Sequence, residues 1–261
     1  MQLSSARIVL TGASGGLGSA LARELAGTGA ALLLCGRDPE RLQRVASSLA
    51  PAADTVAADL TESSGILRVV HAATEFGVNV LINNAGVGSY GLIERQGWEH
   101  VDRVMRTNLL APMRLTQAVL PLLLRQPSAA VVQIGSMFGS LPFPGFTAYS
   151  SAKSGLRGFS QALRRELAGS AVEVFHFSPR AIRTELNSEA VRRLNAALAH
   201  AEDAPEDVAR RIVRGLQGGR HDQHFGFPER MFGWLNAVCP RCIDRGLGSR
   251  ISTIRTIAEQ E

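Results

Sequence analysis

The stretch Thr11-Gly12-Ala13-Ser14-Gly15-Gly16-Leu17-Gly18 joins a short apolar run, residues 7–10, to a segment with helical periodicity. Gly12 permits a tight turn, Gly16 lets the backbone approach a ligand closely, and Gly18 lets the helix pack against the sheet. The free N–H groups and the positive dipole end at the start of that helix favour a phosphate. The strand–turn–helix context therefore predicts a turn that binds the phosphates of a nucleotide.

Strand-like and helix-like segments alternate along the rest of the chain. The predicted strands, such as residues 30–35 and 78–82, are continuous apolar runs, which is typical of parallel strands covered by helices on both faces. Repeated βα units predict an α/β protein with a Rossmann-type, doubly wound parallel sheet of about seven strands, in the order 3-2-1-4-5-6-7. Two separate helices are expected at 98–104 and 108–124, and a short last strand at 221–227.

Composition narrows the class of protein. Apolar residues make up 45% of the 261 residues, which suits one domain over residues 1–261. No apolar run reaches the roughly 18 residues of a membrane span, and no secretory signal is evident. We therefore expect an intracellular, cytoplasmic protein. The net charge of +5 suits a site for a phosphate-bearing ligand, but no basic run with interleaved aromatics indicates nucleic-acid binding.

Cysteines and histidines give no sign of a metal site. Cys239 and Cys242 form a C-x-x-C pair, but the further ligands that zinc requires are missing. We interpret the pair as a coincidence on a C-terminal helix. His221 and His224 are expected to be surface residues of the last strand, and no metal is expected.

Tyr149 and Lys153 open a long predicted helix. Residues four apart share a helix face, so the phenol and the ammonium can point into one cleft. A nearby cation favours phenolate, which should bring the tyrosine pKa, normally near 10, closer to working pH. Such a group can exchange a proton with a carbonyl or alcohol oxygen. Lys153 is the only lysine in the chain, which marks this position independently of any family pattern.

With the spacing T-G-x-x-x-G-x-G and the pair Tyr149-x-x-x-Lys153, the chain resembles the short-chain dehydrogenase/reductase superfamily, in its compact single-domain branch. Residues 83–86 match the family's N-N-A-G segment, Ser136 its catalytic serine and Asn108 its helix asparagine. The resemblance implies an NAD(P)-dependent oxidoreductase with Tyr149 as acid/base. Ser136 would steady the substrate oxygen, Lys153 would also bind the nicotinamide ribose, and Asn108 would hold a water that links Lys153 to solvent.

The resemblance also assigns residues to the cofactor. Asp59 matches the residue that contacts adenine, and the loop 179–184 resembles the P-G segment that clasps nicotinamide. The usual glycine of that segment is Arg180 here, which bears on the loop's shape and the substrate's charge, although Arg180 fits a solvent-facing residue equally well. The expected catalytic residues are Asn108, Ser136, Tyr149 and Lys153, and the expected cofactor-binding residues are Gly12, Ser14, Gly16, Leu17, Gly18, Arg37, Asp59, Leu60, Asn84, Ala85, Gly86, Tyr149, Lys153, Pro179, Ile182 and Thr184.

The residues after the second strand indicate which nucleotide is preferred. An acidic residue in place of Gly36 would bind the ribose 2′-hydroxyl of NAD, whereas glycine leaves room and Arg37 can pair with the 2′-phosphate of NADP. Ser14 can donate a further hydrogen bond, and Asp38 is expected to cap the next helix. We expect NADP(H) to be preferred and NAD(H) to be possible.

The resemblance further implies a substrate lid at 185–218 and a homodimer or homotetramer built through helices 108–124 and 148–167. Aromatic and aliphatic residues near the expected site favour an apolar carbonyl or alcohol substrate, with some of them in the core: Phe138, Leu141, Phe143, Phe146 and Phe177. Two alternatives are a cofactor-bound, non-catalytic binding or regulatory protein of the same fold, and a non-redox enzyme such as an epimerase.

A helical tail is expected at 229–261. Met231, Trp234, Leu235 and Val238 fall at helical spacing, among arginines. Such a stripe can contact an anionic membrane surface. We favour the alternative that it packs over the substrate pocket or a partner subunit, because Pro240 and Gly246 interrupt the helix.

Overall fold

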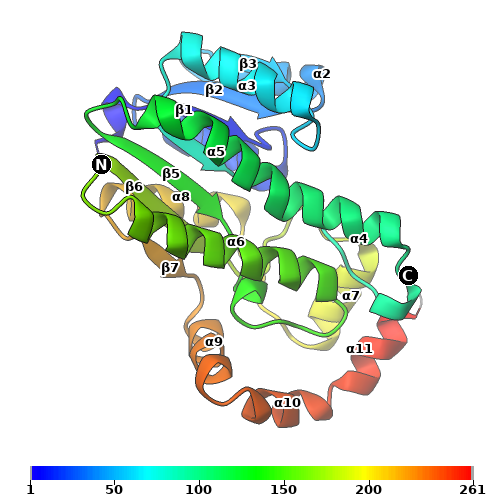
Figure 1. Ribbon diagram of the computed structural model, residues 1–261. Helices are drawn as coiled ribbons and strands as arrows, with labels where there is room; N and C mark the ends of the chain where they lie inside the picture. Colours follow the sequence, from blue (N-terminus) through cyan, green and yellow to red (C-terminus); the bar gives the residue numbers. More distant parts are fainter. Residues whose placement is uncertain (1, 260–261) are drawn as a thin grey trace.

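Seven parallel strands form one sheet in the order β3-β2-β1-β4-β5-β6-β7 in the computed structural model, which describes residues 2–259 (Figure 1). The predicted fold class and strand order are therefore confirmed. The strands are β1 (Arg7–Thr11), β2 (Ala31–Gly36), β3 (Asp54–Ala57), β4 (Val80–Asn83), β5 (Ala129–Ile134), β6 (Val172–Ser178) and β7 (Asp222–His224).

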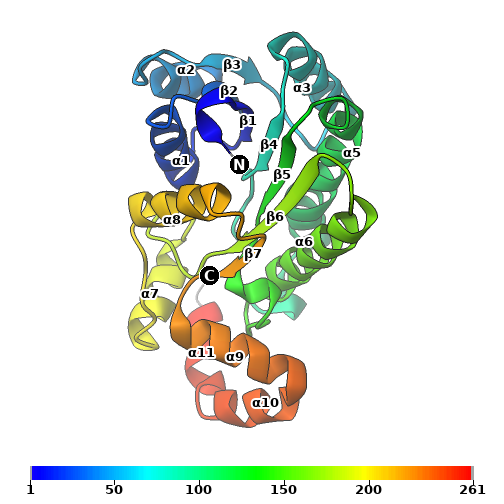
Figure 2. The same cartoon turned by 90° about the vertical axis from the view of Figure 1, so that its left-hand side faces the viewer.

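Helices cover both faces of the sheet (Figure 2). One face carries α1 (Gly16–Ala26), α2 (Pro39–Ser47) and α8 (Pro205–Gln217), and the other carries α3 (Ser63–Phe76), α5 (Ala111–Leu123) and α6 (Thr147–Glu166). All six residues of β5 are buried between the two layers. The continuous apolar runs of the sequence thus correspond to strands with no solvent-facing side.

The two helices predicted in this region are present, but they are joined into one helical run over residues 98–123 and not separated by a loop. The run consists of α4 (Trp98–Met105), a π-helical turn (Arg106–Leu110) and α5. A π turn adds one residue without breaking the helix, and such turns are frequent at functional sites. Here it carries Asn108, one of the predicted site residues.

A third apolar cluster lies beside the loops that follow β4 and β5. It joins Tyr90 and Leu92 to Phe143 and Phe146. Residues of α7 (Glu189–Ala197) and α11 (Ile251–Ala258) complete it, so the chain's last described helix packs against α7. Elements far apart in the sequence therefore enclose one apolar volume near the ends of the central strands.

The C-terminal tail contains α9 (Phe227–Val238), α10 (Pro240–Gly248) and α11, and it lies below the sheet in the view of Figure 2. None of the residues of α9 is buried. The predicted apolar stripe faces away from the protein, since the side chains of Met231, Trp234 and Val238 are 54%, 66% and 64% exposed. The rest of the described chain does not cover this stripe, and its predicted packing against a partner subunit stays a prediction; the buried residues of the described tail are Ile243 of α10 and Ile254 and Ala258 of α11. Residues 260–261 of the expected tail lie outside the described residues.

The last strand is shorter than predicted. Gly226 has a φ of +96°, and α9 begins directly after it. His221 precedes β7 and stacks on Phe175 with 4.8 Å between ring centroids, while its side chain remains 41% exposed. The side chain of His224 is only 14% exposed, so the prediction of a surface residue was wrong for His224.

Cys239 and Cys242 form a disulfide, so their interpretation as a coincidental pair was wrong. Cys239 ends α9 and Pro240 begins α10, because a proline ring cannot continue the preceding helix. The resulting turn brings the two Cα atoms to 5.4 Å, within the range that a disulfide spans. Within residues 2–259, no helix is long and apolar enough to cross a membrane.

Candidate functional site

The glycine-rich turn connects β1 to α1 with almost no room for side chains. Gly12 has a φ of +63°, which favours glycine, and a Cβ on Gly18 would lie 2.0 Å from the carbonyl oxygen of Gly12. The N-cap residue of α1 is Gly15, which has no side chain to cap the helix, so the first N–H groups of α1 are available to a ligand. The predicted phosphate-binding geometry is present: a tight turn that ends at an open helix N-terminus.

Residues after β4 brace this turn. The side-chain amide of Asn84 donates hydrogen bonds to the carbonyl oxygens of Thr11 and Gly12, at 3.0 and 3.2 Å. The Thr11 hydroxyl accepts from the backbone N–H groups of Asn84 and Ala85, both at 3.0 Å. Asn84 therefore acts on the turn itself, and Thr11 is a site residue that we missed, although its position at a strand end next to the glycines could have indicated it.

The corner after β2 brings together Ser14, Gly36 and Arg37. A Cβ on Gly36 would lie 3.2 Å from a methyl carbon of Leu42 and 3.3 Å from the Ser14 hydroxyl, so glycine fits this closely packed corner. Arg37 is exposed and free to bind a ligand, and Asp38 caps α2 through the N–H of Arg41, as predicted. Hydrogen bonds from Thr61 hold the pKa of Asp59 below its ordinary value, with a smaller contribution from Arg37.

Tyr149, Ser136 and Lys153 meet at the end of β5. Ser136 follows the strand and accepts a hydrogen bond from the N–H of Phe138 at 3.2 Å, which leaves its own proton available to the hydrogen bond with the Tyr149 hydroxyl. The Lys153 Nζ donates to the carbonyl oxygen of Ile134 at 2.9 Å and lies 5.7 Å from the centre of the Tyr149 ring. The three predicted side chains are therefore brought together.

Their electrostatics differ from the sequence-based expectation. Burial raises the pKa of Tyr149 above its ordinary value, and the hydrogen bond from Ser136 only partly offsets this effect. Burial also lowers the pKa of Lys153 from 10.5 to about 8. The expected shift of Tyr149 towards phenolate is therefore wrong for the protein alone, because desolvation disfavours both charged forms. The tyrosine is held as a protonated phenol.

Asn108 lies behind this group on the π turn. Its side chain is buried, with 1% of its surface exposed. The side-chain oxygen accepts from the N–H of Val87 at 2.8 Å, and the side-chain amide donates to the carbonyl oxygen of Val87 at 2.9 Å. A Cβ on Gly86 would lie 3.0 Å from this side-chain oxygen and 3.9 Å from the Lys153 Nζ. Asn108 thus fixes the segment that passes in front of Lys153.

The loop after β6 reaches both the serine and the glycine turn. The carbonyl oxygen of Pro179 accepts from the N–H of Met137 at 2.9 Å, next to Ser136. At the other end of the loop, the Thr184 methyl carbon would lie 2.8 Å from a Cβ on Gly16. The side chain of Arg180 is 23% exposed and pairs with Asp203 and Glu229, so it does not face solvent. The sequence could not show these partners.

Aromatic rings flank the candidate tyrosine. The rings of Phe138 and Phe146 both approach the Tyr149 ring edge-on, each at 6.4 Å between centroids. Phe143 stacks on Phe138 at 5.5 Å. Phe177, by contrast, is fully buried in the core between the sheet and α8. Phe138 and Phe146 therefore give the neighbourhood of Tyr149 an apolar character, and Phe177 does not contribute to it.

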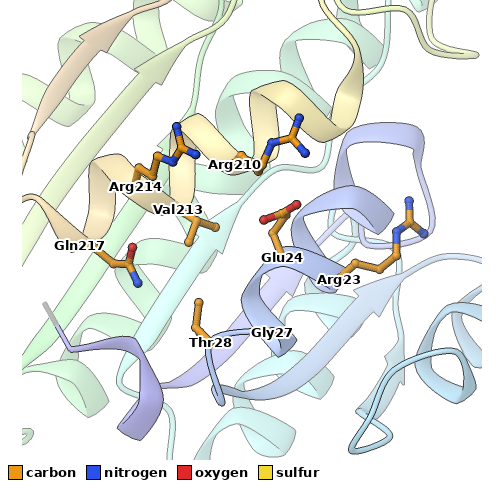
Figure 3. Close-up of a pocket in the computed structure, with 8 residues that line it drawn as sticks. All are labelled: Arg23, Glu24, Gly27, Thr28, Arg210, Val213, Arg214 and Gln217. Carbon is orange, nitrogen blue, oxygen red and sulfur yellow. The ribbon is translucent and has the colours of Figure 1, made fainter.

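A separate hollow lies between α1 and α8, far from these residues. It has a volume of about 470 Å³ and is lined by residues that Figure 3 shows, among them Arg23, Gly27, Arg210 and Arg214. Its residues on α1 belong to the C-terminal end of that helix, about 15 Å from the glycine turn at 1.5 Å per residue. The hollow is therefore distinct from the candidate site.

Comparison with known proteins gives a consistent family. A family model for short chain dehydrogenases matches residues 6–195. Dehydrogenase/reductase SDR family member 7B of Bos taurus is 38% identical over 264 aligned residues, which cover 94% of this chain and 81% of the relative.

Solved structures agree on the fold. A short chain dehydrogenase/reductase from Burkholderia phymatum, in complex with NAD, has a TM-score of 0.83 at 23% identity, covering 93% of this chain and 96% of that one. The closed form of a serine dehydrogenase complexed with NADP⁺ has a TM-score of 0.73 at 26% identity, covering 79% and 87%. Together with the match to the family model, these likenesses show that the chain belongs to the short-chain dehydrogenase/reductase family of NAD(P)-dependent oxidoreductases.

Proposed function

We propose that the protein is an NADP(H)-preferring oxidoreductase that interconverts a carbonyl and an alcohol on an apolar substrate, with Tyr149 as the acid/base. The observation that carries the proposal is the meeting of Tyr149, Ser136 and Lys153 at the end of β5. The glycine turn fits the cofactor, since Gly12 and Gly18 let the turn pack tightly against Ala85 and against itself, and the turn ends at the open N-terminus of α1, which suits phosphates. When bound, the nicotinamide supplies or accepts the hydride.

In the direction of reduction, Tyr149 gives its proton to the substrate oxygen. The raised pKa of the buried phenol suits this direction, because the group stays protonated until negative charge develops on the oxygen. Ser136 holds that oxygen and stabilises the developing charge. Lys153, with a pKa lowered to about 8, is charged at neutral pH and favours the phenolate that remains.

The cofactor preference rests on the corner formed by Ser14, Gly36 and Arg37. The missing side chain of Gly36 leaves the Ser14 hydroxyl uncovered, and Arg37 is exposed directly after Gly36 in the chain. A guanidinium can bind a 2′-phosphate through two charge-assisted hydrogen bonds, whereas the 2′-hydroxyl of NAD offers no charge to pair. NAD(H) can therefore bind, but more weakly.

We also propose a homo-oligomer that forms through α5 and α6, as the family resemblance implies. Leu110 and Leu124, at the two ends of α5, are 46% and 48% exposed, which suits a surface covered by a second copy. Light scattering at micromolar concentration should give the mass of two or four subunits. A mass of one subunit would contradict this assembly.

Replacement of the candidate acid tests the proposed chemistry. Tyr149→Phe should lower kcat by at least about 100-fold with any carbonyl substrate that the protein reduces, while NADPH binding is largely retained. The matched control is Tyr90→Phe, which removes the only other phenol of the chain, whose hydroxyl donates to the carbonyl oxygen of Ile254 at 3.0 Å. It should keep measurable turnover. A Tyr149→Phe variant with a tenth of the wild-type kcat would rule out Tyr149 as the acid.

The same assay separates the two alternative functions. A non-catalytic binding or regulatory protein would bind NADPH without consuming it across a panel of apolar, aromatic and polar ketones. An epimerase would convert substrate with no net change in the absorbance of free NADPH. Substrate-dependent oxidation of NADPH, absent in Tyr149→Phe, would support the proposed reaction.

A further inference from the structure

Arg180 is held by two carboxylates from distant parts of the chain. Its Nε donates to one carboxylate oxygen of Asp203 at 3.0 Å and its Nη2 to the other at 2.7 Å. Its Nη1 lies 3.6 Å from a carboxylate oxygen of Glu229 on α9. The side chains of Arg180 and Asp203 are only 23% and 8% exposed. The hydrogen bonds that Arg180 donates to Asp203 raise the pKa of Arg180 above its ordinary value.

The backbone of Asp203 is paired with the same loop. Its N–H donates to the carbonyl oxygen of Ala181 at 2.9 Å, and its carbonyl oxygen accepts from the N–H of Arg183 at 3.0 Å. These bonds form an isolated bridge between Ile182 and Asp203. The two ends of the segment 184–202 are thereby joined at one point, which we call the lid base.

The segment above the lid base lies over the glycine turn. Thr184 lies against Gly16, and a Cβ on Gly88 would be 2.7 Å from the carbonyl oxygen of Leu186. Glu185 pairs with Arg41 of α2 at 3.2 Å. The predicted lid range also includes α8, but the apolar side of α8 is buried against the sheet. Residues 184–202 are therefore the part of this range outside the main core, and within them α7 buries Ala190, Val191 and Leu194 in the third apolar cluster.

The two ion pairs that hold this segment, Arg41–Glu185 and Arg180–Asp203, differ in strength. The Arg41–Glu185 pair is exposed, with 47% and 87% of its side chains in solvent, and exposed pairs contribute about 0–1 kcal/mol. The pair at the lid base is bidentate and largely removed from water, which fixes its geometry. Without Arg180, the buried carboxylate of Asp203 keeps only the longer contact with Arg211, at 3.6 Å, and loses both hydrogen bonds of the bidentate pair. Between the buried pair at the lid base and the buried side of α7, the stretch around Glu185 is thus the weakly held part of the segment.

We propose that Arg180 is a positioning residue: by pairing with Asp203 it closes the lid base and sets the position of Thr184 over the glycine turn, and through Glu229 it ties α9 to the same point. The proposal rests on the proposed function only in that this segment covers the bound nicotinamide cofactor. Arg180 itself touches neither the glycine turn nor Tyr149 in this role. The residue that replaces the family's glycine would then stabilise the loop through side-chain pairing.

The test compares Arg180→Met with Arg183→Met. Both remove one arginine from the same loop, but the Arg183 side chain is exposed and makes no ion pair within residues 2–259. Hydrogen exchange of the cofactor-free protein should be at least tenfold faster at the Arg183 and Asp203 amides in Arg180→Met, and unchanged in Arg183→Met. Exchange in β5 should stay slow in both, which excludes a general loss of folding.

Kinetics provide the second readout. Arg180→Met should raise KM for NADPH about tenfold or more and change kcat by less, because the cofactor must then order the lid base itself. Arg180→Lys keeps the charge but not the bidentate pairing, so its KM should lie between wild type and Arg180→Met. Glu229→Gln should speed exchange in α9 while the Asp203 amide stays protected.

The proposal would be overturned by unchanged exchange at Arg183 and Asp203 in Arg180→Met, or by equal acceleration in Arg183→Met. A fall in kcat with constant KM would also overturn it, since Arg180 would then act on the reaction itself. If no carbonyl substrate is turned over, the proposed function fails, but the exchange comparison still decides the role of Arg180. If Arg180→Met does not fold, Arg180→Lys and Asp203→Asn provide the same comparison.

Discussion

The chain up to the end of β6 and the chain after it differ in the contacts that hold them in place. Before Pro179, buried strands such as β5 and the apolar sides of α1, α5 and α6 fix the backbone, and the site residues stand on this rigid frame. After Pro179, α8 still packs its apolar side against the sheet, but the loop and tail around it are held by ion pairs around Arg180 and by an apolar cluster with α7 and α11, and α9 has no buried residue. The proposed catalytic residues therefore stand on the first region, whereas the proposed lid belongs to the second.

Substituting one glycine in each region tests this difference most directly. Gly18→Ala would place a Cβ 2.0 Å from the Gly12 carbonyl oxygen, so it should destabilise the fold by about 1–3 kcal/mol and abolish cofactor binding. Gly246→Ala, in α10, meets nothing within 4 Å and should stabilise by about 0.5–1 kcal/mol. Denaturant unfolding and NADPH titration check both. Similar effects at the two positions would show that the regions do not differ in rigidity.

The buried lysine gives the first region a dependence on pH. The folded protein loses the Lys153 proton near pH 8, whereas the unfolded chain keeps it to about pH 10.5. The unfolded state therefore binds more protons between these values, and this group should raise the free energy of unfolding by about 3 kcal/mol as the pH rises from 8 to 10.5.

Lys153→Met isolates this contribution. Cys35, whose pKa burial raises to about 12, opposes the effect of Lys153, but it does so equally in both proteins. The difference in free energy of unfolding between wild type and Lys153→Met, measured without cofactor, should thus increase with pH over this range. A difference that stays constant with pH would mean that Lys153 is as solvated as the arginines of the tail.

The cofactor corner should respond to one charge. Arg37→Ala should weaken NADPH binding on the order of 10–100-fold and leave NADH nearly unaffected, because only NADPH carries the 2′-phosphate and a charged hydrogen bond contributes about 1.5–3 kcal/mol. Arg44→Ala, at the last turn of α2, is the matched control. Fluorescence titration of both cofactors measures the effect. An equal loss for NADPH and NADH would disprove the NADP preference.

The smallest effect is expected on the outer side of α9. Trp234 is 66% exposed, so Trp234→Ser should change the free energy of unfolding by less than about 0.5 kcal/mol. The same variant tests which surface the apolar stripe of α9 contacts in solution. Wild-type protein that stays in the supernatant with phosphatidylserine vesicles at low salt would exclude membrane contact, and a smaller assembly in Trp234→Ser would assign the stripe to a partner subunit.

Prediction from sequence succeeded where a pattern is local or periodic. Buried strands show as apolar runs, the glycine turn as a fixed spacing, and Tyr149 and Lys153 as a four-residue interval on one helix. Prediction failed where the cause is three-dimensional. The partners of Arg180 lie far along the chain, at Asp203 and Glu229, and no periodicity connects them. The pKa of Tyr149 is raised because burial, which spacing does not report, outweighs the hydrogen bond with Ser136.

The position of Lys153 also has a consequence for chemical labelling. The chain holds no other lysine, so this is the only side-chain amine that a reagent specific for amines can modify. Its side chain is 5% exposed, and with a pKa of about 8 a substantial fraction is uncharged and nucleophilic at mildly alkaline pH. Acylation at this residue, located by peptide mapping to separate it from the N-terminal amine, would therefore report how often the site opens to solvent.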